Sequence, residues 1–141
     1  MTVDKYMVSL KVFLTNTKWE TLILQNSNKW HSRGFYDVPG GRIDDDEFDI
    51  DYETIIKREI SEELWKDVKC NISLKPVSMW RFQCYEDRVF LLMFEADYIA
   101  GDIIISDEHE SYKWVKLDKI NLEEYFMSGM LESVKRYLEY K

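Results

Sequence analysis

One stretch of the chain, from Pro39 to Asp67, joins a Pro-Gly-Gly turn to an acidic run and then to an amphipathic segment. Apolar residues recur there at three- and four-residue steps, which predicts a helix from about Tyr52 to Lys66 with one apolar stripe. The stripe consists of Tyr52, Ile55, Ile56, Ile60 and Leu64. Asp51 is the predicted N-cap, because its carboxylate can accept a backbone N–H of the first turn. This helix must therefore cover an apolar partner elsewhere in the fold.

Three glutamates lie in the C-terminal half of the predicted helix: Glu59, Glu62 and Glu63. At about 100° per residue, Glu59 and Glu63 fall beside the apolar stripe and Glu62 lies on its flank. The helix macrodipole is negative at this end, so each carboxylate should cost stability. A bound divalent cation reverses that effect, because Mg²⁺ prefers oxygen ligands. The pattern indicates a divalent-metal site, and the alternative is a solvated acidic edge.

The same stretch resembles the signature of the Nudix hydrolases, G-x5-E-x7-R-E-U-x-E-E-x-G-U, in which U is an aliphatic residue. Gly41 to Glu47 matches its first part, and Arg58-Glu59-Ile60-Ser61-Glu62-Glu63 matches its central part. Ten residues separate Glu47 from Arg58 where the signature has seven, so that Glu47 and Asp49 are alternatives for the first acidic position. Trp65 stands in place of the late glycine, which would normally end the helix in a left-handed conformation.

The resemblance implies an α/β fold, the Nudix-type α/β/α sandwich with a mixed β-sheet, as a single domain over residues 1–141. Pattern alone indicates only an α/β or α+β domain with a mixed sheet. The resemblance also implies Mg²⁺ as the cofactor, with Mn²⁺ as a substitute. The implied metal ligands are the carbonyl of Gly41 and the carboxylates of Glu59, Glu62 and Glu63.

The activity that the resemblance implies is hydrolysis of a nucleoside diphosphate linked to another group, which gives a nucleoside monophosphate and a phosphorylated remainder. Nucleoside triphosphates, ADP-ribose and sugar nucleotides all fit this description. Glu62 and Glu63 belong to the implied catalytic helix, and Arg58 is interpreted as a residue that orients the carboxylates. The general base stays open among three glutamates, two of which lie in a downstream acidic loop. They are Glu63, Glu108 and Glu110.

Aromatic and basic residues around the predicted site are candidates for contacts with the small-molecule substrate. They are Trp30, Tyr36, Arg33, Arg42 and Arg81. The aromatic rings can stack on a base and the guanidinium groups can contact phosphates, but each residue also fits ordinary packing or solvent exposure. His109, between two glutamates, fits a general base or a substrate ligand, and alternatively a surface residue beside a carboxylate.

Charge and composition limit the partners. The net charge of −8, with 27 acidic and 19 basic residues, and the lack of a basic run argue against a nucleic-acid partner. The longest apolar run, Val89 to Phe94, is too short to cross a membrane, and the N-terminus lacks a signal pattern. Cys70 and Cys84 lack metal-ligand spacing, which favours free thiols in a cytoplasmic protein.

Two other functions stay open, and so does the formation of a homodimer. A non-catalytic nucleotide-sensing Nudix-like domain would be favoured by loss of Glu59 or Glu63, and both are present. An RNA-cap hydrolase would need a basic track for RNA. Aromatic residues near the N-terminal strands leave room for a homodimer.

The rest of the chain predicts strands and one further helix. The expected strands cover residues 6–15, 21–25, 35–38, 71–77, 79–85, 88–98 and 103–105. The resemblance implies a further, aromatic strand at the end of residues 106–115, after a loop that bears glutamates. Val89 to Phe94 is apolar on both faces, which predicts a central strand covered by helices on both sides. Ser128 is the predicted N-cap of the last helix. Its expected buried face consists of Met130, Leu131, Val134, Tyr137 and Leu138.

Overall fold

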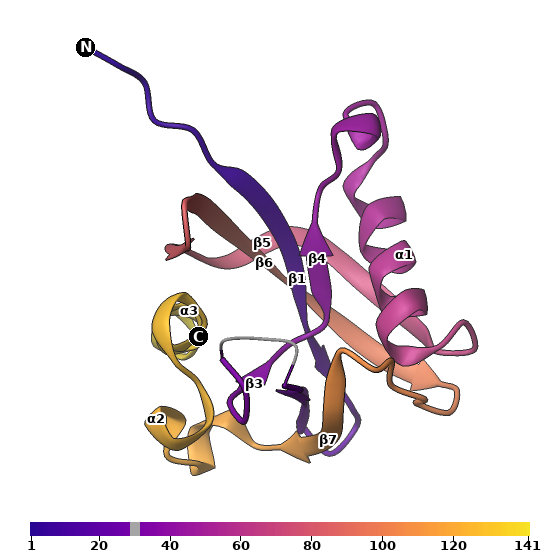
Figure 1. Ribbon diagram of the computed structural model, residues 1–141. Helices are drawn as coiled ribbons and strands as arrows, with labels where there is room; N and C mark the ends of the chain where they lie inside the picture. Colours follow the sequence, from indigo (N-terminus) through magenta and orange to yellow (C-terminus); the bar gives the residue numbers. More distant parts are fainter. Residues whose placement is uncertain (29–31) are drawn as a thin grey trace.

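The computed structural model describes residues 1–28 and 32–141. Seven strands of these residues form one mixed sheet in the order β3-β2-β1-β6-β5, with β4 paired to β1 and β7 paired to β2 (Figure 1). The strands are β1 (Met7–Thr15), β2 (Thr21–Asn26), β3 (Tyr36–Asp37), β4 (Gly40–Arg42), β5 (Lys69–Cys84), β6 (Asp87–Ala100) and β7 (His109–Val115). The helices are α1 (Tyr52–Leu64), α2 (Leu122–Tyr125) and α3 (Ser128–Tyr140), with 3₁₀ turns η1 (Asp45–Glu47) and η2 (Leu117–Lys119).

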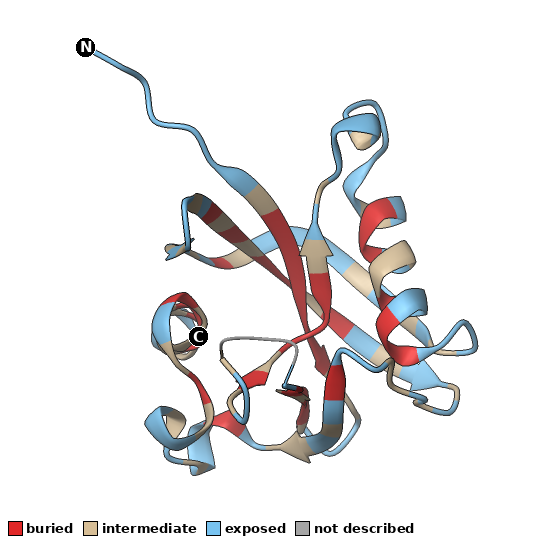
Figure 2. Ribbon diagram, in the orientation of Figure 1, coloured by how far each residue is buried: buried red, intermediate tan, exposed pale blue. Residues whose placement is uncertain are grey.

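The centre of the sheet is the parallel pair of β1 and β6, and the other pairings are antiparallel. Figure 2 shows that β1 is buried along most of its length. Leu10 and Val12 pack in the core under α1, whereas Phe13 packs in the core under α3. Because side chains alternate along a strand, a strand with both faces buried needs a helix on each side. The α/β/α sandwich and the central place of residues 89–94 are therefore confirmed.

Helix α1 begins as predicted and ends two residues earlier than predicted. Asp51 caps it, since its carboxylate accepts the Thr54 N–H at 3.3 Å. The apolar stripe packs against β1 with Ile56 and Leu64 fully buried, while Tyr52 stays 52% exposed. Trp65 ends the helix with φ 98° and ψ 148°. Glycine adopts this conformation readily. Trp65 therefore ends the helix where the signature has a glycine, and it does so at a cost in backbone strain.

Three other predicted elements need correction. The two strands expected at 71–77 and 79–85 are one long strand, β5, whose pairing with β6 is irregular between Ser73 and Ser78. Residues 103–105 form no strand, because their backbone is used to close the end of α1. Ser128 is the first residue of α3 rather than its cap, and Met127 occupies the N-cap position without a side-chain bond.

The end of α1 is tied to the segment that leads into β7. The Ile104 N–H donates to the Leu64 carbonyl at 3.0 Å, and the Ser106 N–H donates to the Glu63 carbonyl at 3.2 Å. These bonds satisfy two of the carbonyls that a helix end leaves without partners. They also bring the first residue of β7 beside the last turn of α1. Among the described residues, no helix has the length and apolar character needed to cross a membrane.

Candidate active site

Glu63 lies at the centre of the site, on the last turn of α1. Its side chain is only 8% exposed, and its Oε1 accepts the Gly40 N–H at 2.7 Å. Burial raises the pKa of Glu63 to about 8, although Lys11 and the Gly40 N–H act in the opposite direction. A buried carboxylate of this kind needs a nearby cation or hydrogen-bond donors to stay charged.

Glu59 lies one turn earlier and packs on the second glycine of the turn. A Cβ at Gly41 would lie 2.5 Å from Oε2 of Glu59, so no other residue fits there without displacing the carboxylate. Burial raises the pKa of Glu59, and Arg58, whose Nη1 is 3.0 Å from Oε1, opposes that rise. Gly40 and Gly41, the Gly-Gly turn of the sequence pattern, form the start of strand β4, and their backbone lies directly against the carboxylates of Glu63 and Glu59.

Arg58 contacts the carboxylates of Glu47, Glu59 and Glu62. Its Nη2 and Nε donate to the two carboxylate oxygens of Glu47 at 2.7 and 2.9 Å, a bidentate pair. Its Nη1 is 3.3 Å from both carboxylate oxygens of Glu62, whose side chain is 59% exposed. The backbone N–H of Asp44 and then Arg58 lower the pKa of Glu47. Of the two alternatives for the first acidic position, Glu47 is the one that contacts Arg58 in spite of the longer loop.

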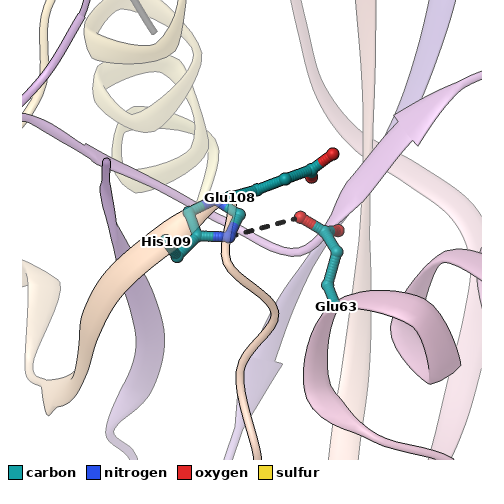
Figure 3. Close-up of side chains that lie close together, drawn as sticks. All are labelled: Glu63, Glu108 and His109. Atoms are coloured by element: carbon teal, nitrogen blue, oxygen red, sulfur yellow. Dashed lines mark ion pairs between the residues drawn. The ribbon is translucent and has the colours of Figure 1, made fainter. Parts of the chain in front are cut away.

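The segment before β7 completes the cluster. Ligand atoms of Glu63, Glu108 and His109 all lie within 4.8 Å of one another (Figure 3). His109 is buried, so the interpretation of this residue as a surface histidine is wrong. Burial lowers the pKa of His109, although Asp37 acts to raise it. Glu110 points to the other side of the strand, where its Oε1 is 3.7 Å from Nε of Arg33.

These donors fit a divalent cation. Burial opposes the ionisation of Glu59 and Glu63, which a cation would favour. Gly41 leaves room for no side chain between the turn and Glu59. The Nδ1 of His109 is buried and has no hydrogen-bond partner among the described residues. Carboxylate oxygens with one imidazole are a donor set that divalent metals accept.

A cavity of about 130 Å³ lies on the α3 side of the sheet, and Lys11 and Asp37 of its lining also act on the ionisation of Glu63. Its lining includes Tyr36 and Phe82 as aromatic walls and Lys11, Asp37 and Arg42 as charged groups. The remaining lining residues are Asn26, Ser32, Phe35, Cys84, Leu91, Met127, Ser128, Gly129 and Met130. A mostly apolar pocket with a few polar groups is the usual form of a small-molecule site.

Lys11 is a residue of this site that the sequence reasoning missed. It lies on β1, and its Nζ donates to Oδ2 of Asp37 at 2.9 Å and to the Val38 carbonyl at 3.2 Å. Burial acts to lower the pKa of Lys11, but Asp37 and then Glu63 outweigh burial and raise it. The only signal for this role was the position of Lys11 in a strand whose neighbours on the same face are buried.

Some of the residues predicted to contact the substrate line the cavity, and others do not. Tyr36 and Arg42 line the cavity, and Nη1 of Arg42 is 3.7 Å from Oδ2 of Asp87. Arg33 is exposed and pairs with Glu110. Arg81 is exposed and precedes Phe82 on β5, so it faces away from the cavity. Trp30 lies outside the described residues.

Comparison with known proteins gives the family. A family model described as the NUDIX domain matches residues 5–137. No match was found among curated proteins. The MutT protein from Methanosarcina mazei Go1 is similar with 25% sequence identity and a TM-score of 0.74, over 99% of this chain and 96% of that chain.

Two more distant solved structures share the fold. The ORF135 protein of E. coli is 15% identical with a TM-score of 0.76, over 96% of this chain and 90% of that chain. An ADP-ribose pyrophosphatase from Streptococcus suis is 16% identical with a TM-score of 0.68, over 96% of this chain and 91% of that chain. An α/β/α sandwich with a Gly-Gly turn against a carboxylate-bearing helix defines the class of the Nudix hydrolases, which act on phosphoanhydride bonds. The chain belongs to the NUDIX domain family.

Proposed function

We propose that the protein is a divalent-metal-dependent pyrophosphohydrolase. It cleaves a nucleoside diphosphate linked to a further group into a nucleoside monophosphate and a phosphorylated remainder. The observation that carries this proposal is the buried carboxylate of Glu63, held at 2.7 Å by the N–H of Gly40, with Glu59 packed on Gly41. Such a cluster is costly without a cation and suited to binding one.

The cation would be held by the Gly41 carbonyl with Glu59, Glu62 and Glu63. Mg²⁺, or Mn²⁺ in its place, would supply a water of lowered pKa and offset the charge of the diphosphate. Arg58 keeps the carboxylates in position through its contacts with Glu47 and Glu59. Little covalent chemistry then remains, because positioning and charge neutralisation dominate phosphoryl transfer.

The proton of the attacking water passes to a glutamate. Glu63 and Glu108 have ligand oxygens within 4.8 Å of each other, which supports these two glutamates as candidates for the general base. Glu110 is the weaker candidate, because its carboxylate lies beside the guanidinium of Arg33. A general base must reach the water directly or through one further water.

The nucleoside would enter the cavity between the sheet and α3. Tyr36 and Phe82 offer faces for stacking, and the Lys11–Asp37 pair offers both a donor and an acceptor to a base or ribose. Arg42 lines the cavity directly after Gly40 and Gly41, which supports its proposed contact with a phosphate. Nucleoside triphosphates, ADP-ribose and sugar nucleotides are the substrate classes that this arrangement can accept.

A panel of these compounds incubated with Mg²⁺, with products separated by chromatography, tests the proposal. Turnover of at least one class to a nucleoside monophosphate is expected. Binding of nucleotides without turnover of any would contradict the proposal and favour a nucleotide-sensing domain. If capped RNA, tested beside the panel, were the one compound hydrolysed, the proposed small-molecule substrate would be wrong.

A further inference from the structure

His109 is a buried histidine with an unused nitrogen. Its side chain is 3% exposed, and Nδ1 has no hydrogen-bond partner among the described residues. Nδ1 faces the Glu63 carboxylate at 3.8 Å from Oε2, which is too long for a hydrogen bond (Figure 3). A buried polar atom without a partner costs stability. A bound ion would give this nitrogen a partner.

The two oxygens of Glu63 face different partners. Oε1 accepts the Gly40 N–H, and Oε2 is the atom nearest the imidazole. Two ligands of one ion, each at about 2.0–2.2 Å, stand up to about 4.4 Å apart. The separation of 3.8 Å between Nδ1 and Oε2 lies inside this limit. A carboxylate oxygen of Glu108 lies within 4.8 Å of a ligand atom of Glu63 and of a ligand atom of His109, and it provides a third donor.

The backbone holds this arrangement in place. The His109 N–H donates to the Ser106 carbonyl at 3.3 Å, and the Ser106 N–H donates to the Glu63 carbonyl at 3.2 Å. His109 also pairs with Asn26 of β2 at the start of β7. The imidazole is therefore positioned by a strand and by the end of α1 together, as a ligand residue needs to be.

We propose that Nδ1 of His109 is a metal ligand that, with Glu63 and Glu108, forms a mixed nitrogen–oxygen site. The proposal rests on the proposed function, since it concerns the same metal-dependent chemistry. Imidazole suits transition metals, whereas Mg²⁺ prefers a shell of oxygens. This chain should accordingly bind Mn²⁺ and Co²⁺ in strong preference to Mg²⁺.

Nitrogen coupling in the pulsed EPR spectrum of bound Mn²⁺ tests this directly. The chain has two histidines, so the His31→Gln variant grown with ¹⁵N-histidine carries the label at His109 alone. A directly bound ¹⁵N is expected in this variant and should be absent in His109→Gln grown in the same way. Mn²⁺ bound without a ¹⁵N coupling in His31→Gln would overturn the proposal, and so would a coupling that persists in His109→Gln.

Metal affinities from titration calorimetry give a second readout that requires no turnover. In His109→Gln, Mn²⁺ binding should weaken about 10- to 100-fold and Mg²⁺ binding about two-fold or less, with an unchanged melting temperature of the metal-free chain as the control. Equal losses for both metals would overturn the proposal. If the chain binds Mn²⁺ without nitrogen and still turns over substrate, this inference fails while the hydrolase stands. If neither metal binds, both fail.

Discussion

At the scale of single residues, the site depends on carboxylates that burial holds at raised pKa. Glu63 is buried between the Gly-Gly turn and β7, and Glu59 is packed on a glycine that leaves it no spare room. Buried ionisable groups with perturbed pKa values are typical of functional sites. Arg58 and Lys11 offset part of the cost of this burial from opposite sides of the cluster.

Gly41→Ala tests how closely the turn fits Glu59. Gly41 has no positive φ, so alanine meets no backbone strain, but its Cβ would collide with the Glu59 carboxylate. The expected result is a loss of about 10²-fold in kcat with a small change in melting temperature, because displacement of a catalytic group by about 1 Å has this effect. Steady-state kinetics and thermal melting measure both. Unchanged kcat would mean that Glu59 is not held in a required position.

Glu63 should make stability depend on pH in the metal-free chain. Its pKa is raised from 4.5 to about 8, so between these values the folded chain keeps a proton that the unfolded chain has lost. The free energy of unfolding therefore falls as pH rises through this window, by about 1.4 kcal/mol per pH unit for one fully coupled group. Urea unfolding at pH 5.5, 6.5 and 7.5 should show this slope in the wild type relative to Glu63→Gln. A difference between the two proteins that does not vary with pH would contradict it.

At the scale of the elements, the last turn of α1 connects the carboxylates, the Gly-Gly turn and the segment before β7. The carbonyls of Glu63 and Leu64 accept N–H groups from that segment, so the helix end and His109 are placed by the same contacts. Trp65 closes the helix in a backbone conformation suited to glycine. Strain beside an active site persists where the surrounding contacts hold it.

Trp65→Gly should relieve this strain. The matched control is Trp65→Ala, which removes the same indole but keeps a Cβ at φ 98°. The glycine variant is expected to be more stable than the alanine variant by about 1 kcal/mol, measured by urea unfolding. An alanine variant of equal or higher stability would show that the helix end carries no strain.

Periodicity was sufficient to place α1, the central strands and α3, because these elements bury one or two regular faces, and the Asp51 cap placed the start of α1. The C-terminal end of α1 and the full length of β5 were not predictable, since Trp65 replaces a glycine and the irregular pairing between Ser73 and Ser78 depends on β6. The role of Lys11 and the burial of His109 were not predicted for a related reason. Their roles depend on Asp37 and Glu63, partners that only the folded chain brings near.

At the scale of the whole molecule, the sheet has the carboxylate-bearing helix on one face and the cavity on the other. Helix α1 covers one face and carries the carboxylates, whereas α3 covers the other face and closes the cavity beside the sheet (Figure 1). Lys11 connects the carboxylates with the cavity. It pairs with Asp37, which lines the cavity, and it acts on the ionisation of Glu63. A substrate with a nucleoside in the cavity would have its diphosphate at the carboxylates.

Removal and return of metal, with Glu63→Gln as the comparison, shows whether hydrolysis depends on a cation held by Glu63. Hydrolysis of the best substrate by the wild type should stop in EDTA and return with added Mg²⁺ or Mn²⁺. Glu63→Gln should stay about 10²- to 10⁴-fold slower at saturating metal, because it loses a ligand or base that acts on the reacting water. Full activity of the wild type in EDTA, or of Glu63→Gln in metal, would contradict the account.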